Sequence, residues 1–153
     1  MRLVRAIAAV MILASIFLTF TACEDIASPL EDFKWVLTQY GAPGDLHFPV
    51  GNTEVSAFFD SKTKTVSGGD GFNDYTGTYA VDHLTVTLNG KLTVTKNACS
   101  ADVAAQENYF VSTLQRADRF AMDHGKLTIY AGVDSITFKN TNSTIKPPTH
   151  WGQ

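Results

Sequence analysis

A glycine-rich segment, residues 67–77, carries the polar side chains that are best suited to binding a ligand or a metal in this 153-residue chain. Asp70, Asn73 and Asp74 offer oxygen atoms of the kind that bind Ca²⁺, but they lack the regular spacing and the closing glutamate of a calcium loop. Asp and Asn beside glycines are also typical of turns, in which their side chains accept hydrogen bonds from the nearby backbone. We therefore expect a shaped turn here and no metal site.

The other reactive residue types form no catalytic pattern. None of the four histidines stands at metal-ligand spacing from another His or Cys, and His83 and His124 each follow an aspartate at a predicted turn. No serine lies in a Gly-x-Ser-x-Gly context, and no phosphate or dinucleotide loop is present. Glu107, beside the apolar face of a predicted helix, is expected to hydrogen-bond the backbone or a tyrosine and hold that helix on the sheet. We therefore expect no catalytic residue and no cofactor. The alternative, a hydrolase or another enzyme, would need a clustered acid or nucleophile in a pocket.

The first residues are typical of a secreted lipoprotein. Arg2 and Arg5 precede an apolar run, residues 6–18, which together form the basic and apolar regions of a signal peptide. Small residues then lead to Cys23, as in a bacterial lipobox, although Phe20 stands where Leu is usual. We predict that residues 1–22 are removed and that Cys23 is the lipid anchor. The alternative is an uncleaved segment in which Cys23 is an ordinary core cysteine.

The mature chain is predicted to lie close to a membrane. Residues 23–33 are acidic and are expected to form the lipidated cysteine and a short solvated tether. Removing residues 1–22 leaves 131 residues, with ten basic and fifteen acidic side chains and a net charge of −5. This length fits one domain, and the acidic balance argues against binding to nucleic acid or to anionic lipid. We expect a cell-envelope protein at the outer membrane or the outer face of the cytoplasmic membrane.

Hydrophobic patterning predicts one mainly antiparallel β domain over residues 34–139. One helix is expected over residues 103–116, capped by Ser100 or Asp102, with an apolar stripe at helical spacing. Residues 45–53 are predicted to be a loop, and residues 140–153 a polar tail with two prolines that ends near Trp151. The predicted strands are 34–38, 55–59, 64–66, 76–81, 84–88, 92–95, 120–122, 127–130 and 136–138.

Asn89-Gly90 has the composition of a two-residue hairpin turn between residues 84–88 and 92–95. Simple pairing across it would place Leu88 opposite Lys91, so the apolar rows of the two strands would fall on opposite faces. Either a bulge or a third loop residue restores the register, or residues 92–95 do not pair there as a simple hairpin. We favour the bulge.

An ordered set of residues resembles the META-domain (HslJ-like) family of small bacterial envelope proteins. The set comprises Trp35, Ser67, Gly68, Gly71, Phe72, Asn73, Tyr75, Gly77, Tyr79, Cys99 and Glu107. The resemblance implies an α+β fold, mainly antiparallel β, in which a single small curved or barrel-like sheet carries one packed helix. It marks the glycine segment as a structural or binding loop, and we expect Tyr75 and Tyr79 to pack on the sheet with their hydroxyls at its edge.

One departure from the family pattern concerns Phe72, which stands where many members have a cysteine that can pair with a second one at the position of Cys99. This chain therefore cannot form that bridge. We expect Phe72 to fill the space by apolar burial and Cys99 to be a buried, inert thiol.

The resemblance implies a non-enzymatic, monomeric envelope protein with a stress-protective or protein-interaction role and an envelope protein as partner. A second hypothesis is an inhibitor of a lysozyme or protease that acts through residues 67–77. A lipocalin-like carrier would instead need an open, apolar barrel interior. Trp151 is expected either to fold back on the domain or to anchor a partner.

Overall fold

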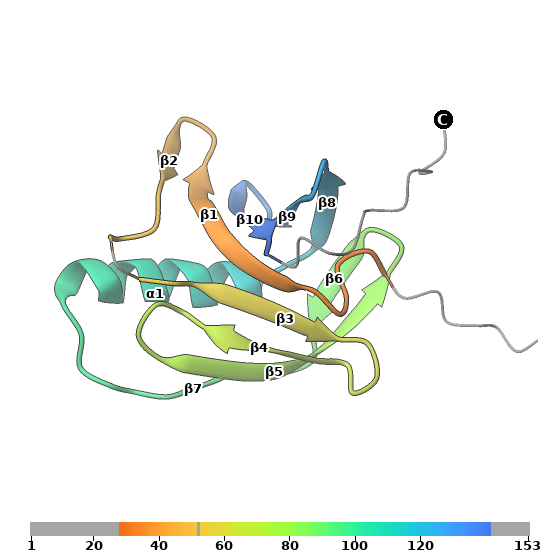
Figure 1. Cartoon of the computed structure of the whole chain (residues 1–153), viewed down its shortest axis with the longest axis horizontal. Coiled ribbons are helices and arrows are strands. Elements are labelled where there is room, and N and C mark those ends of the chain that lie inside the picture. The colour runs from red at the N-terminus through yellow and green to blue at the C-terminus, as the bar shows by residue number, and fades with distance from the viewer. Residues whose placement is uncertain (1–27, 52, 142–153) are drawn as a thin grey trace, which may run out of the picture.

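The computed structural model describes residues 28–51 and 53–141 (Figure 1). The predictions for the signal peptide, for Cys23 and for Trp151 fall outside these residues.

The described chain forms ten strands and one helix. In chain order these are β1 (Lys34–Ala42), β2 (Asp45–His47), β3 (Ser56–Asp60), β4 (Thr65–Gly69), β5 (Asp74–Asp82), β6 (Thr85–Leu88), β7 (Thr93–Val94), α1 (Ala101–Gln115), β8 (Arg119–Asp123), β9 (Lys126–Ala131) and β10 (Asp134–Asn140).

All strand pairs are antiparallel, and eight strands form the sheet order β6-β5-β4-β3-β1-β10-β9-β8. The short strands β2 and β7 pair with β1 and β5, off this path. The two edge strands come together, because the Phe120 amide of β8 donates to the Leu84 carbonyl beside β6 at 2.8 Å. The sheet is thus a nearly closed barrel accompanied by one helix, which confirms the predicted fold class (Figure 1).

Large apolar side chains fill the barrel interior. Phe110 of α1 packs between Tyr75 of β5 and Phe138 of β10, with ring centroids 5.4 and 6.2 Å apart. Trp35 and Phe59 are also buried in this core. An interior occupied by side chains in this way contrasts with the open cavity that the carrier hypothesis requires.

Helix α1 begins and ends within two residues of the prediction, with Ser100 at its N-cap position, although the Ser100 side chain makes no capping hydrogen bond. Its C-terminal part is fixed to β10 by Asp134, which accepts from the Tyr109 hydroxyl at 3.0 Å and from the Arg116 guanidinium at 2.8 Å. The hydrogen bonds from Arg116 and Tyr109 lower the pKa of Asp134, so this contact stays charged at neutral pH.

The prediction of a hairpin at Asn89-Gly90 is wrong. Strands β6 and β7 pair in succession with the same strand, β5, so the chain continues past Asn89 instead of turning back. Between the pairs Tyr79–Leu88 and Thr76–Thr93, four residues on one side face two on the other. The extra residues, 89–92, form a wide bulge between β6 and β7. This bulge resolves the register conflict, because β6 and β7 both pair with β5 and not with each other.

Residues 45–47 form the short strand β2, where a loop is predicted. β2 folds back on the end of β1, with Tyr40 opposite His47 and Ala42 opposite Asp45. Gly41, at φ +138°, permits this return, since a Cβ there would lie 2.1 Å from the Asp45 carbonyl oxygen. The strand was missed because all three of its residues are exposed, so it has no apolar alternation.

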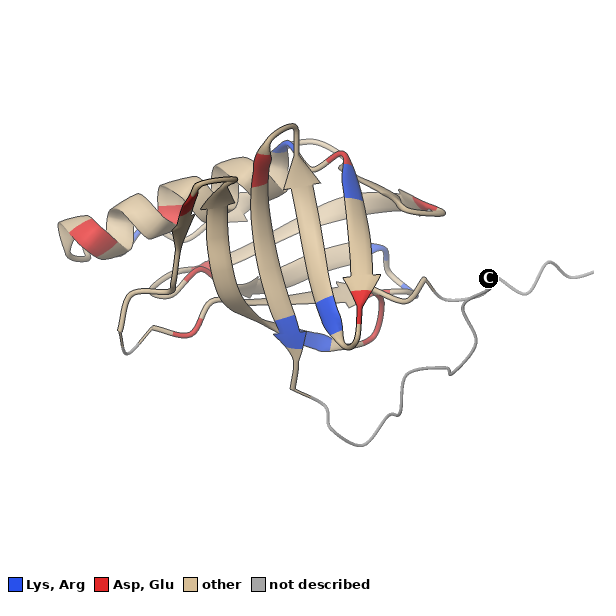
Figure 2. Ribbon diagram, turned by 90° about the horizontal axis from the view of Figure 1, so that it is seen from above, with Lys and Arg blue, Asp and Glu red and all other residues tan. Residues whose placement is uncertain are grey.

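The barrel has two distinct ends. One, here named the loop end, carries residues 41–51, residues 53–54, the glycine segment 69–74 and the start of α1. The other, here named the clip end, carries residues 28–33 and the turns at 61–64, 83–84 and 124–125. Figure 2 shows charged residues mainly at strand ends and in turns, with uncharged strand centres on the side in view.

Candidate functional site

The glycine segment is a tight turn organised by Asp70. Its Oδ1 atom accepts from the backbone amides of Phe72 at 3.2 Å and Asn73 at 2.8 Å, while its own amide donates to the Asn73 carbonyl at 2.9 Å. The turn interpretation is confirmed. Asp70 is fully buried, and among the described residues its Oδ2 atom has no hydrogen-bond partner.

Asn73 connects this turn to the two segments beside it. Its Nδ2 donates to Glu107 Oε2 of α1 at 3.0 Å, and its Oδ1 accepts from the Asn97 amide at 2.7 Å and from the Thr95 hydroxyl at 3.2 Å. The expectation that Glu107 bonds the backbone or a tyrosine is therefore wrong about the partner. Glu107 still holds the helix to the sheet, but through the Asn73 amide.

Gln106 is a site residue that the sequence prediction missed. It is fully buried; its Oε1 accepts from the Val50 amide at 2.7 Å, and its Nε2 donates to the Thr53 hydroxyl at 3.2 Å and to the Asp70 carbonyl at 3.5 Å. The signal was its position, three residues after Val103 and four before Phe110, on the apolar stripe of the helix.

Two motif glycines are required by close packing. A Cβ on Gly71, at φ +108°, would lie 2.8 Å from Gln106 Nε2. A Cβ on Gly77 would lie 2.6 Å from Leu92 Cδ2, so this glycine makes room for the wide bulge between β6 and β7. Ser67 lies in β4, opposite Phe58 and Thr76.

Two expectations about the missing disulfide are wrong. Phe72 is 51% exposed and does not fill a buried space. Cys99 is half-buried, not fully buried, and carries a free thiol. Asn73, the next residue after Phe72 in this turn, has a side chain that is buried against Glu107.

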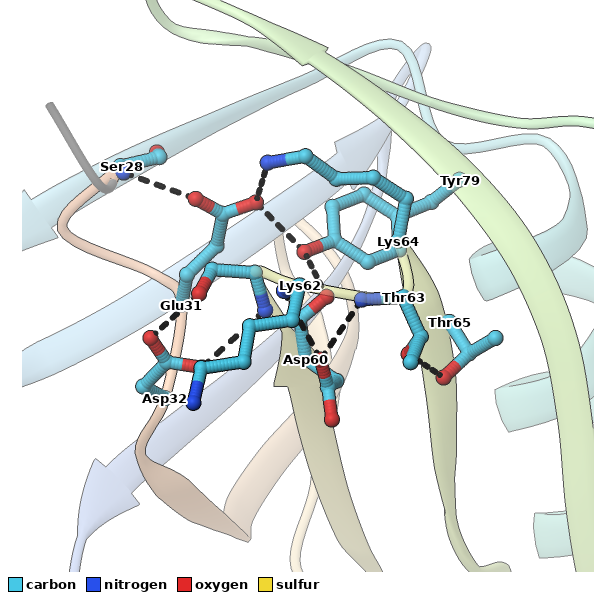
Figure 3. Close-up of polar contacts among 10 residues, drawn as sticks. Ser28, Glu31, Asp32, Asp60, Lys62, Thr63, Lys64, Thr65 and Tyr79 are labelled. Atoms are coloured by element: carbon cyan, nitrogen blue, oxygen red, sulfur yellow. Dashed lines mark hydrogen bonds and ion pairs between the residues drawn. The ribbon is translucent and has the colours of Figure 1, made fainter. Parts of the chain in front are cut away.

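At the clip end, Glu31 organises a second polar cluster (Figure 3). Glu31 is 2% exposed, and its carboxylate accepts from the Tyr79 hydroxyl at 2.5 Å, the Lys64 ammonium at 2.8 Å and the Ser28 amide at 2.9 Å. The prediction of a solvated tether is therefore wrong for this residue and for Leu30, which is fully buried. The Tyr79 hydroxyl is also buried against Glu31 and not at a free sheet edge.

Further contacts fix the same segment, residues 28–33, to the barrel. The Trp35 indole donates to the Leu30 carbonyl at 2.8 Å, and the Asp32 amide donates to the Phe59 carbonyl at 2.8 Å. The Asp32 carboxylate accepts from the Ser61 amide at 3.0 Å and hydroxyl at 2.6 Å. We call residues 28–33 with these partners the N-terminal clip.

The clip is arranged to keep Glu31 charged. Burial raises the pKa of its carboxyl, but hydrogen bonds from Lys64, Tyr79 and Ser28 and the charge of Lys64 outweigh burial and leave the pKa below its usual value. Burial, and then the bond to Glu31, raise the pKa of Tyr79, whose hydroxyl therefore stays protonated and donates.

Stability at acid pH is expected to depend on Glu31. Because its pKa is lower in the folded chain than the ordinary 4.5, its contribution is complete above that pH and is lost as pH falls through the folded value. A Glu31→Gln variant should be less stable at neutral pH and lose less stability on acidification, as measured by urea unfolding between about pH 3 and pH 7. Glu54→Gln, at an exposed ion pair, controls for net charge. Parallel pH curves for wild type and Glu31→Gln would contradict the prediction.

Two properties of the described residues bear on the kind of site. Residues 28–51 and 53–141 contain no group of three or more His, Cys, Asp or Glu side chains placed to hold a metal ion. Within the same part of the chain, no helix has the length and apolar character needed to cross a bilayer.

Comparisons with known proteins place the domain. The sequence profile of the META domain matches residues 28–143. A protein from Burkholderia xenovorans solved by NMR is 22% identical, with a TM-score of 0.64 over 75% of this chain and 89% of that one. A DUF4847 family protein from Bacteroides vulgatus is 17% identical, with a TM-score of 0.51 over 72% and 93%. No curated protein sequence matches the chain significantly. At these identities the structural likeness concerns the fold alone.

Proposed function

Since this chain belongs to the META domain family, we propose that it is a non-enzymatic protein of the bacterial cell envelope, anchored by a lipid on Cys23 and protective under stress through binding of other envelope proteins. The observation that carries the proposal is the N-terminal clip. It fixes the start of the domain at one end of the barrel and leaves the glycine segment at the other.

The clip gives an anchored domain a defined orientation. Cys23 precedes Ser28 by five residues, so the two Cα atoms are at most about 17 Å apart. Strand β5 runs from Asp74 at the loop end to Asp82 at the clip end, and its nine residues span about 30 Å. With the lipid on Cys23, the clip end would lie near the membrane and the loop end would face away from it.

Lipidation is tested by feeding cells an alkyne analogue of palmitate and following the full chain. We expect the label on wild type and on Cys99→Ala, but not on Cys23→Ala, which should accumulate as an uncleaved precursor. Label that persists in Cys23→Ala would contradict the anchor.

The protective role is tested in a strain that lacks the gene. Survival after heat challenge should be restored by the wild-type protein and much less by Cys23→Ala. Equal rescue by the two would show that protection does not need the anchor.

A second candidate, inhibition of a lysozyme or protease through residues 67–77, is favoured by one observation. Phe72 is exposed on a turn whose backbone is fixed by Asp70 and Asn73, as an inserting side chain would require. The full chain should then inhibit a hydrolase at 1:1 stoichiometry, and Phe72→Ser should abolish inhibition without changing the thermal unfolding midpoint. Inhibition unchanged in Phe72→Ser would rule out this mode of action.

A further inference from the structure

Two exposed aromatic side chains stand on neighbouring segments of the loop end. Phe72 is 51% exposed and Phe48 is 74% exposed. The segments that carry them are both bonded to Gln106, through the Val50 amide on one side and the Asp70 carbonyl on the other. One buried side chain thus joins Val50 and Thr53 on one side to Asp70 on the other.

Hydrogen bonds fix the backbone of the turn that carries Phe72, and of Val50, two residues after Phe48. Gln106 accepts from Val50, Thr53 Oγ1 donates to the Val50 carbonyl at 2.6 Å, and the Phe72 amide is bonded to Asp70. A partner that contacts Phe72 therefore would not have to order the loop, which removes part of the usual entropy cost of binding. Exposed aromatic side chains on rigid backbone are typical centres of protein interfaces.

The charged residues around this surface are mostly acidic. Within the described parts of segments 45–54, 69–74 and 95–107, Lys96 is the one lysine or arginine. The acids there are Asp45, Glu54, Asp70, Asp74, Asp102 and Glu107. Asp70 is buried, Glu107 is half-buried, Glu54 pairs with Lys34 of β1 and Asp45 Oδ1 lies 3.1 Å from His47 Nε2, which leaves Asp74 and Asp102 as the remaining exposed acids. Such a surface favours a cationic partner and repels anionic lipid headgroups.

We propose that the loop end binds a cationic, amphipathic protein segment, in which lysine or arginine side chains flank a bulky apolar one. The apolar side chain packs on Phe48 and Phe72, and the basic side chains face the exposed acids. This deepens the protein-interaction role proposed above by naming the class of partner. It does not depend on lipidation, so peptide binding and the labelling of Cys23 can fail separately.

The test uses the full chain in non-ionic detergent and a fluorescein-labelled peptide of alternating lysine and leucine, followed by anisotropy. We expect saturable binding that weakens with salt. The double variant Phe48→Ser/Phe72→Ser should weaken it about tenfold or more, and Asp74→Asn/Asp102→Asn should weaken it severalfold and reduce the salt dependence. Leu84→Ser, which removes a 58% exposed side chain at the clip end, should bind as wild type does.

Four results would overturn the proposal. Unchanged affinity in the double phenylalanine variant would remove the aromatic surface from binding. If oligolysine bound as tightly as the lysine–leucine peptide, binding would depend on charge alone. If an alternating glutamate–leucine peptide bound as tightly, binding would depend on apolar contact alone. Vesicles of phosphatidylethanolamine and phosphatidylglycerol that bind through Phe48 and Phe72, with no peptide binding, would assign the surface to lipid. Each variant alters exposed side chains, and matching thermal midpoints verify that the fold is retained.

Discussion

Replacing Gly68 by alanine is expected to destabilise the barrel by about 3–5 kcal/mol, a large share of the stability of a small domain. The added Cβ would lie 2.0 Å from the Ser56 carbonyl oxygen and 3.1 Å from the Tyr75 hydroxyl. The methyl group must therefore push β3 away from β4. The same movement breaks the 2.8 Å hydrogen bond that the buried Tyr75 donates to Ser56.

The neighbouring glycine supplies the control. A Cβ on Gly69 has no neighbour closer than 3.7 Å, and its backbone has no positive φ, so Gly69→Ala should change stability by no more than about 1 kcal/mol. Urea unfolding of the two variants and wild type, followed by tryptophan fluorescence, measures the difference. Equal stabilities of Gly68→Ala and Gly69→Ala would show that β3 and β4 can separate at little cost.

Local patterns account for what the sequence predicted correctly. Strands β5 and β6 and the helix have apolar residues at period 2 or at helical spacing, so each is recognisable from its own residues. The turn at Asp70 is recognisable in the same way, because Asp and Asn beside glycines bond to their own nearby backbone. At Asn89-Gly90 the local turn composition was misleading, because the length of the wide bulge is set by pairing with β5, ten or more residues earlier.

The rest of the candidate site depends on contacts between residues distant in sequence. Glu31 lies in an acidic stretch that resembles a tether, and only the approach of Lys64 and Tyr79 makes its burial favourable. Asn73 and Glu107 are both motif residues, yet nothing within either segment identifies the other as its partner. Gln106 could have been found, because the spacing of the helix places it on the buried face.

A negative charge at Asn73 is expected to be the most informative change at the loop end. Asn73→Asp keeps an oxygen to accept from the Asn97 amide and the Thr95 hydroxyl, but it replaces the Nδ2 donor with an oxygen facing Glu107 Oε2. Two carboxylates would then meet at a site where Asn73 is 3% exposed. We expect a loss of about 2–4 kcal/mol at neutral pH, because two like charges meet where water is excluded.

A second change should repair the first. In Asn73→Asp/Glu107→Gln, the introduced amide donates to the introduced carboxylate, so the hydrogen bond between helix and turn is restored with its direction reversed. Glu107→Gln alone should cost no more than about 1 kcal/mol, because its amide oxygen can still accept from Asn73 Nδ2. Urea unfolding of the four chains gives the coupling energy between the two positions. A double variant as unstable as Asn73→Asp would mean that the loss does not come from the meeting of the two carboxylates at positions 73 and 107.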